Sequence, residues 1–196
     1  MSLFPQVHFL LSVASVPQFP ADDGREVAFA GRSNAGKSSA INAITVRNGL
    51  ARTSKTPGRT KLLNFFELEP GRRIIDLPGY GYAEASPAER KQWTALIEAL
   101  PARASLAGLF LIVDIRRGIT AQDEQLVDWA GAAGWQVHVL LTKSDKLNQR
   151  DRAAALKAAR DLLGEGMTAQ IFSAEDKTGV KEAQSRLLSM LQAQAS

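Results

Sequence analysis

Apolar residues along the chain fall into short runs that alternate with longer amphipathic stretches. Such runs, bounded by glycine, proline and polar turn formers, are typical of strands that are buried or half-buried. They lie at 27–30, 62–68, 72–75, 108–114, 137–141 and 168–172. Segments with helix-forming composition or apolar residues at helical spacing separate most of them, and these predict helices at 38–44, 87–100, 123–133, 150–163 and 180–191.

This alternation predicts an α/β fold, a three-layer sandwich with helices on both faces of the sheet. We expect a mostly parallel six-stranded sheet with one antiparallel strand, 62–68, because the turn Pro70-Gly71 joins it to 72–75 as a hairpin. The whole chain, 1–196, is expected to be a single domain. Residues 1–24 form either an edge strand or a packed N-terminal arm, since prolines end their apolar run early.

A glycine-rich segment lies between the first predicted strand and the first predicted helix. Its spacing, G-x-x-x-x-G-K-S, is that of a phosphate-binding loop, in which backbone N–H groups and a helix N-terminus face phosphate oxygens. The lysine is expected to reach the β- and γ-phosphates, and the first serine to ligate magnesium. The candidate residues are Gly31, Arg32, Ser33, Asn34, Ala35, Gly36, Lys37, Ser38 and Ser39.

A basic stretch at 47–61 follows the first helix and contains no acidic residue. Its position is that of the first switch loop of a GTPase. Thr60 is the candidate second protein ligand to magnesium and the sensor of the γ-phosphate, with Gly58 and Arg59 beside it. The alternative is a solvated surface loop whose charges bind nothing.

A D-x-x-G motif stands at the end of the strand 72–75. Asp76 is expected to hold a magnesium-bound water, and the Gly79 amide is expected to contact the γ-phosphate, with Leu77 and Pro78 between them. The next residue is Tyr80, at a position where Ras-like enzymes carry a glutamine that orients water.

Two further motifs follow the strands 137–141 and 168–172. The first reads Thr142-Lys143-Ser144-Asp145. Its aspartate can accept hydrogen bonds from guanine N1 and N2, and its lysine can brace the phosphate loop. After the second strand, the Ala174 amide is expected to reach guanine O6, with Ser173 and Glu175 beside it.

Composition limits the remaining possibilities. The chain has 196 residues, no cysteine and a net charge of +4, which leaves no disulfide, thiolate metal site or lipidated cysteine. No apolar run is long enough to cross a membrane, so membrane insertion is not expected. The basic bias is a weak indication of nucleic-acid binding.

Taken together, the motifs resemble translation-factor-class GTPases, and their fuller strings are similar to the bacterial EngB family, also called YihA or YsxC. The most specific string is Asp76-Leu-Pro-Gly-Tyr-Gly-Tyr-Ala83. The resemblance implies a cytoplasmic, magnesium-dependent GTPase that binds GTP and GDP. It also implies a role in assembly of the large ribosomal subunit, with precursor rRNA and ribosomal proteins as partners, and in cell division and septation. We expect a monomer, with Lys37, Thr60 and Gly79 serving catalysis.

Three alternatives and one hypothesis stay open. A nucleotide kinase would share the phosphate loop, but the guanine motif argues against it. A trafficking GTPase would need a lipid anchor. A GTP-gated binding module acting mainly in septation would hydrolyse little GTP. Because Tyr80 replaces the glutamine, slow intrinsic hydrolysis is expected, with the ribosome or a K+ ion completing the site. Several relatives of the family with an asparagine at the position of Asn34 use potassium, and the resemblance extends this hypothesis to Asn34. The alternative is that Asn34 only hydrogen-bonds the loop backbone.

Overall fold

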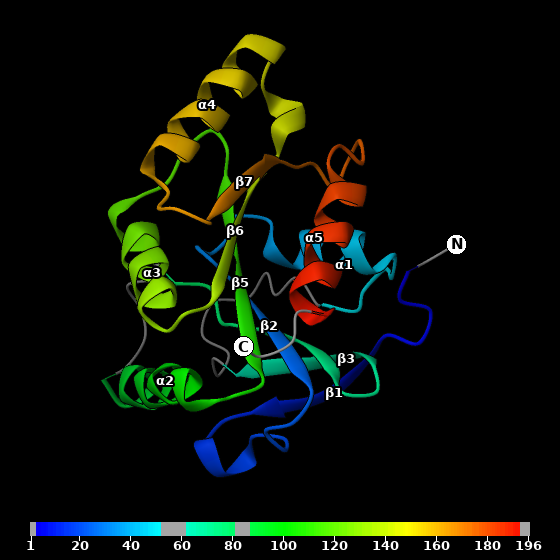
Figure 1. Cartoon of the computed structure of the whole chain (residues 1–196), viewed down its shortest axis with the longest axis vertical. Coiled ribbons are helices and arrows are strands. Elements are labelled where there is room, and N and C mark those ends of the chain that lie inside the picture. Colours follow the sequence, from blue (N-terminus) through cyan, green and yellow to red (C-terminus); the bar gives the residue numbers. More distant parts are fainter. Residues whose placement is uncertain (1–2, 52–61, 81–86, 193–196) are drawn as a thin grey trace.

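The computed structural model describes residues 3–51, 62–80 and 87–192 (Figure 1). Its centre is a seven-stranded sheet in the order β1-β3-β4-β2-β5-β6-β7. The strands are β1 (His8–Val13), β2 (Arg25–Gly31), β3 (Leu63–Glu69), β4 (Arg72–Asp76), β5 (Leu106–Asp114), β6 (Gln136–Thr142) and β7 (Thr168–Ile171).

The sheet confirms the predicted fold class and corrects the predicted strand count. β3 pairs antiparallel with β4, as the hairpin prediction requires, and β2, β4, β5, β6 and β7 pair in parallel. The expectation of six strands is wrong because β1 adds a seventh, antiparallel to β3 at the sheet edge. Of the two readings of the N-terminal segment, an edge strand is therefore correct for His8–Val13. Its alternation is weak, since only Val13 is fully buried.

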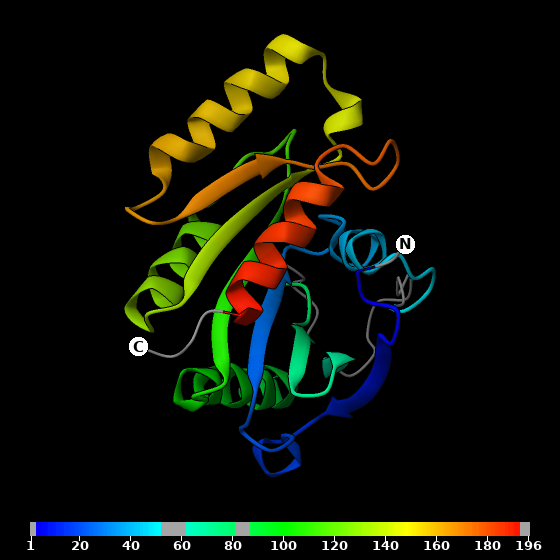
Figure 2. The same cartoon turned by 45° about the vertical axis from the view of Figure 1, so that its right-hand side comes forward.

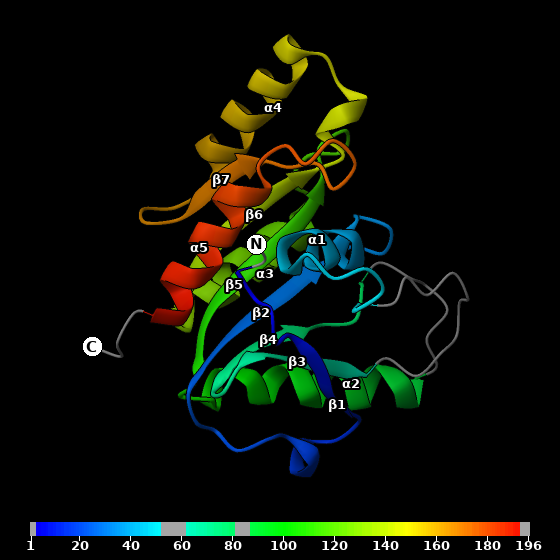
Figure 3. The same cartoon turned by 90° about the vertical axis from the view of Figure 1, so that its right-hand side faces the viewer.

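Among the described residues, five α-helices cover the two faces of the sheet. They are α1 (Lys37–Thr45), α2 (Pro87–Ala99), α3 (Ala121–Ala132), α4 (Gln149–Leu162) and α5 (Val180–Gln192). α1 and α5 bury Ile41, Ile44, Leu187 and Met190 on one face, whereas α2, α3 and α4 pack on the other. Figure 3 shows α1 and α5 in front of the sheet with α3 behind it, and Figure 2 shows α5 running along the strands. Within the described ranges, no helix is long and apolar enough to cross a membrane.

A buried ion network ties the N-terminal segment to the amino ends of the strands. Glu26 on β2 is fully buried and pairs with Arg103 (Nε–Oε2 2.7 Å) and Arg73 (Nη1–Oε1 3.1 Å). Arg103 also donates to the carbonyl oxygens of Pro20 and Ala21. Removing one partner of such a network leaves a buried charge uncompensated, at a cost of about 3–5 kcal/mol. The network lies at the opposite end of the strands from the motif residues.

Candidate functional site

The phosphate-loop motif joins β2 to α1 in the predicted strand–loop–helix order. Gly36 has φ +99°, a conformation that favours glycine, and Lys37 begins the helix directly after it. A Cβ at Gly31 would lie 2.6 Å from the carbonyl oxygen of Ile112, so only glycine allows β2 and β5 to approach this closely here. The first turn of α1 carries no acidic side chain. Its N-terminal N–H groups and positive dipole end therefore remain suited to an anion.

Lys37 and Asp76 meet although they stand on different elements. The Lys37 Nζ donates to Asp76 Oδ1, and both side chains are largely buried. The parallel pairing of β4 with β2 sets this contact, because Asp76 lies opposite Phe29 near the carboxyl ends of both strands. The Leu77 amide continues the pairing by donating to the Phe29 carbonyl oxygen at 3.0 Å.

The D-x-x-G segment lies directly against the phosphate loop. The Ser33 amide donates to the Tyr80 carbonyl oxygen at 3.0 Å, and Arg32 forms an isolated parallel bridge with Tyr80. A Cβ at Gly79 would lie 2.8 Å from Ser33 Oγ and 3.2 Å from its Cα. A side chain at position 79 would therefore displace the Ser33 hydroxyl and press on the loop backbone, which favours glycine there.

The T-K-S-D loop braces the phosphate loop through two side chains. Lys143 Nζ donates to the Asn34 carbonyl oxygen at 2.6 Å and to Asp114 Oδ2 at 2.9 Å. Thr142 Oγ1 donates to the Ala35 carbonyl oxygen and lies 3.0 Å from that of Val113. Lys143 has φ +59°, a left-handed backbone conformation. The predicted bracing contact of this lysine is thus present.

Asp145 lies beside the serine that follows β7. Ser173 Oγ donates to Asp145 Oδ1 at 2.8 Å, and Lys146 Nζ lies 2.9 Å from Asp145 Oδ2. The bonds from Lys146 and then Ser173 lower the pKa of the Asp145 carboxyl, so that it is a charged acceptor at neutral pH. Ser173 Oγ also accepts from the Glu175 amide at 3.2 Å.

Ser144 and Ala174 lie next to Asp145 and Ser173 in the loops that follow β6 and β7. The buried Ser144 is held by its amide, which donates to the Phe172 carbonyl oxygen at 3.2 Å, and Ala174 packs on the core cluster beneath α1 and α5. The structure thus brings the last two motifs together at the carboxyl ends of β6 and β7.

Some candidate residues are not placed in this way. Gly58, Arg59 and Thr60 lie outside the described residues, as does most of the predicted first switch loop. Asn34 has φ +64° and is exposed. In the described part of the chain its side-chain amide makes no hydrogen bond. The alternative role of Asn34, a bond to the loop backbone, is therefore not seen there.

Sequence reasoning missed two acidic residues that organise the site. Asp114, at the end of β5, binds Arg116 (Nη2–Oδ2 2.6 Å) as well as Lys143, and these bonds hold the pKa of its carboxyl far below the usual range. Asp123 accepts from the Thr120 amide at 2.8 Å and from the Tyr80 hydroxyl. The T-x-x-D spacing of a helix capping box could have identified Asp123. The bond from Tyr80 to Asp123 depends on tertiary structure, and no local pattern indicates it.

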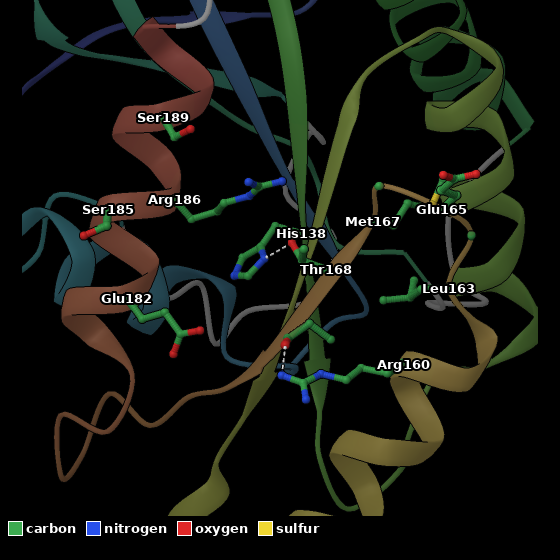
Figure 4. A pocket seen from close by; sticks show the side chains of 13 residues that line it. His138, Arg160, Leu163, Glu165, Met167, Thr168, Glu182, Ser185, Arg186 and Ser189 are labelled. Atoms are coloured by element: carbon green, nitrogen blue, oxygen red, sulfur yellow. Dashed lines mark hydrogen bonds between the residues drawn. The ribbon is translucent and has the colours of Figure 1, made fainter.

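A cavity of about 820 Å³ lies away from these motifs, between α5 and the edge strand β7 (Figure 4). Its lining includes Arg160, Glu182 and Arg186, and the buried His138 bonds to Thr168 at its floor. None of the nucleotide-motif residues that the structure describes lines it. A smaller cavity of about 200 Å³ adjoins the phosphate loop itself.

Comparison with known proteins agrees with the geometry. The model of the family described as "50S ribosome-binding GTPase" matches residues 26–143. A protein of Dechloromonas aromatica named "Probable GTP-binding protein EngB" is 49% identical over 97% of this chain and 90% of its own length.

Two solved structures share the fold at low sequence identity. The crystal structure of a probable GTP-binding protein engB is 21% identical, with a TM-score of 0.66 over 85% of this chain and 98% of that chain. A structure of Era in complex with MgGDPNP and nucleotides of 16S ribosomal RNA is 17% identical, with a TM-score of 0.62 over 89% of this chain and 59% of that chain. From the match over nearly its whole length to a curated EngB protein, this chain belongs to the EngB family of GTP-binding proteins.

Proposed function

We propose that this protein hydrolyses GTP to GDP and phosphate and acts as a nucleotide-dependent switch in assembly of the large ribosomal subunit. The observation that carries the proposal is the position of Lys143, whose ammonium joins the phosphate loop at Asn34 to the T-K-S-D loop. That contact aligns a phosphate cradle with a base-reading carboxylate, Asp145, as one site. In a nucleotide bound across both loops, the phosphates would contact the phosphate loop and the base would contact Asp145.

Base selection is assigned to Asp145. Its carboxylate offers two acceptor oxygens, which suits the N1–H and N2–H donors of guanine, whereas adenine presents an acceptor at N1 and no amino donor at position 2. Ser173 holds one of these oxygens at 2.8 Å and thereby fixes the orientation of the carboxylate. The Ala174 amide, on the same loop, is the proposed donor to guanine O6, with Thr142, Ser144 and Glu175 shaping the pocket.

Phosphate binding is assigned to Gly31 through Ser39, and catalysis to Lys37, Gly79 and Thr60. The helix start without an acidic side chain, together with the hard oxygen donors of Ser38 and Thr60, fits a nucleotide bound with magnesium. Magnesium would neutralise charge on the phosphate oxygens. Lys37 Nζ would balance developing charge on the γ-phosphate, and the Gly79 N–H would hydrogen-bond to it. Asp76 is expected to bind a water of the magnesium shell.

Intrinsic hydrolysis is expected to be slow. The residue after Gly79 is Tyr80, and its hydroxyl is bonded to Asp123 on α3. It therefore does not supply the water-orienting group that a glutamine would provide. We propose that the ribosomal partner, or a K+ ion beside Asn34, completes the site.

The ribosomal role is supported by the family and by charge. The matching family is described as ribosome-binding, and Era, a neighbour in fold, has been crystallised with 16S ribosomal RNA. A net charge of +4 favours a polyanionic partner. The resemblance to EngB adds the expected cytoplasmic location, monomeric state and requirement for normal cell division.

Co-sedimentation with large-subunit precursors tests this function. The full-length protein, loaded with a non-hydrolysable GTP analogue or with GDP, is centrifuged with precursor particles from a depleted strain. We expect retention with the analogue and release with GDP, at least tenfold apart. Equal retention in both states would contradict the switch. Absence of binding in both would contradict the ribosomal role and favour action at the septum.

A further inference from the structure

A second polar cavity lies behind the phosphate loop. It holds about 200 Å³ and is bounded by residues 32–35 of the loop, the end of β5, residues 116–118 and the start of α3. Gly36, Lys37 and Ser38, which face the proposed nucleotide phosphates, do not line it. The cavity therefore lies beside the part of the loop that faces the phosphates, and it shares residues 32–35 and Lys143 with the proposed nucleotide site.

The two carboxylates in this cavity are already engaged. Asp114 is bound by Arg116 through two hydrogen bonds, 2.9 Å from Nε and 2.6 Å from Nη2, and by Lys143. Asp123 accepts from Thr120 with both the amide and the hydroxyl, and from Tyr80. Neither carboxylate is placed to pair with a further cation.

Two arginines in the lining have no such engagement. Within the described part of the chain, the guanidinium groups of Arg32 and Arg117 make no hydrogen bond or ion pair. Four cationic and two anionic side chains line the cavity, which leaves an excess of two positive charges. Arg32 is half-buried and Arg117 is exposed, so the two unpaired cations differ in their contact with solvent.

We propose that this cavity binds a backbone phosphate of RNA, with Arg32 and Arg117 as its ligands. Guanidinium groups bind phosphate oxygens in pairs of hydrogen bonds, which favours this anion over isolated halides. RNA is chosen over an acidic protein segment because the chain is basic overall and because of the ribosomal role, on which this inference rests.

The site is placed to respond to nucleotide. Arg32 follows Gly31 directly and is bridged through its backbone to Tyr80, the residue after the D-x-x-G motif. A γ-phosphate that draws Gly79 closer would move that bridge and the Arg32 wall with it. Occupancy of the cavity and the nucleotide state are therefore linked, and the linkage is reciprocal.

The test measures binding of a short fluorescent single-stranded RNA to the full-length protein, with saturating GDP and magnesium to block the nucleotide site. Arg117→Gln is compared with Arg150→Gln, a matched loss of one exposed cation on α4, far along the chain from the cavity. We expect about tenfold weaker binding for Arg117→Gln and less than twofold for Arg150→Gln. The slope of log affinity against log salt should fall by about 0.7 for the first variant.

Two further arms identify the ligand. A morpholino of the same sequence, whose backbone is uncharged, should not bind, and a polyglutamate peptide should not displace the RNA. Equal losses for the two variants, or displacement by polyglutamate, would overturn the proposal. Co-sedimentation of Arg117→Gln separates this inference from the function. If wild type and variant bind precursor particles equally in the GTP form, the proposal that the cavity binds RNA is contradicted, and the ribosomal role is supported. If wild type does not bind precursor particles, while RNA binding still depends on Arg117, the ribosomal role is contradicted and the RNA site in the cavity is supported.

Discussion

The hydroxyl of Tyr80 donates a hydrogen bond to Asp123 Oδ1, which joins the residue after the D-x-x-G motif to the first turn of α3. Asp123 is only 2% exposed, and its other oxygen caps the helix through Thr120. Burial, together with the bond to Asp123, raises the pKa of Tyr80 far above its usual range. The segment after β4 is thus bonded through Tyr80 to α3, which packs on β5 and β6.

Tyr80→Phe tests the strength of this fastening. The variant removes the donor to a buried carboxylate oxygen, so the free energy of unfolding should fall by about 1–3 kcal/mol. Urea denaturation followed by circular dichroism measures it as a lower midpoint at unchanged slope. Ser12→Ala, which deletes an exposed hydroxyl bond to Asn64, is the matched control and should change stability by less than about 0.5 kcal/mol. Equal effects of the two variants would show that the Tyr80 bond contributes little.

The pH dependence of the same variant gives a second reading. Because the folded pKa of Tyr80 is raised, its unfolded form loses the proton first, and wild-type stability should fall as pH rises above the unfolded value near 10. Tyr80→Phe should lack that part of the decline. Parallel stability curves between pH 9 and 11 would contradict a buried, bonded hydroxyl.

The local patterns predicted the elements well and the contacts between them unevenly. The strand–loop–helix order around Gly36 and the hairpin at Pro70-Gly71 follow from local turn chemistry, and both are present. The pairing of Lys37 with Asp76 follows from the parallel β2–β4 register. Local pattern does not distinguish an edge strand from a packed arm at His8–Val13, because the strand is formed by pairing with β3, which no local pattern records.

The same limit explains the missed residues. Asp114 looks like the polar end of a buried strand, and only the fold brings Lys143 and Arg116 to it. The sequence around Tyr80 shows only that a tyrosine follows the D-x-x-G motif, whereas its partner, Asp123, stands 43 residues further along the chain.

His138 predicts an acid-sensitive step in stability. It is buried on β6 between Thr168 Oγ1 at 2.7 Å and Gln170 Oε1 at 2.9 Å. Burial, with a smaller effect of the nearby Arg186, lowers the pKa of His138 to about 4. A lowered histidine pKa means that the unfolded chain binds the proton first as pH falls.

The stability of the wild type should therefore decrease between pH 6.5 and 4, by up to about 3 kcal/mol from His138 alone. His138→Gln removes the titration, so the difference between the two proteins should narrow as pH falls through this window. Denaturant titrations at several pH values measure it. A constant difference between wild type and variant would contradict a neutral buried imidazole.

Val46 predicts a stabilising substitution. It ends α1 with φ +55° and is 58% exposed, so a β-branched residue holds a left-handed backbone without much burial in return. Val46→Asn should raise the free energy of unfolding by about 1 kcal/mol, measured by thermal and urea denaturation. Val16→Asn is the control, since Val16 is 43% exposed and has no positive φ. A gain of the same size at both positions would mean that removing an exposed apolar side chain, and not relieving the left-handed backbone, stabilises the protein.

Asn34 predicts a choice between monovalent cations. Its exposed side chain stands in the phosphate loop, where a K+ ion could supply the charge that an arginine finger supplies elsewhere. GTP turnover should be about tenfold faster in potassium than in sodium at equal ionic strength, and Asn34→Ala should abolish the difference. Equal rates in both salts, with and without ribosomal subunits, would leave the ribosome as the activator.

The central claim is that a guanine nucleotide binds across the phosphate loop and the T-K-S-D loop, and Asp145→Asn tests it most directly. The amide donates where the carboxylate accepted, so the preference should move from guanosine to xanthosine nucleotides, while Ser173 can still bond the remaining oxygen. Equilibrium competition of GDP and XDP against a fluorescent nucleotide measures both affinities on one protein. The account predicts at least a hundredfold loss for GDP, about 3 kcal/mol, and a gain for XDP. Unchanged GDP affinity with no gain for XDP would contradict it.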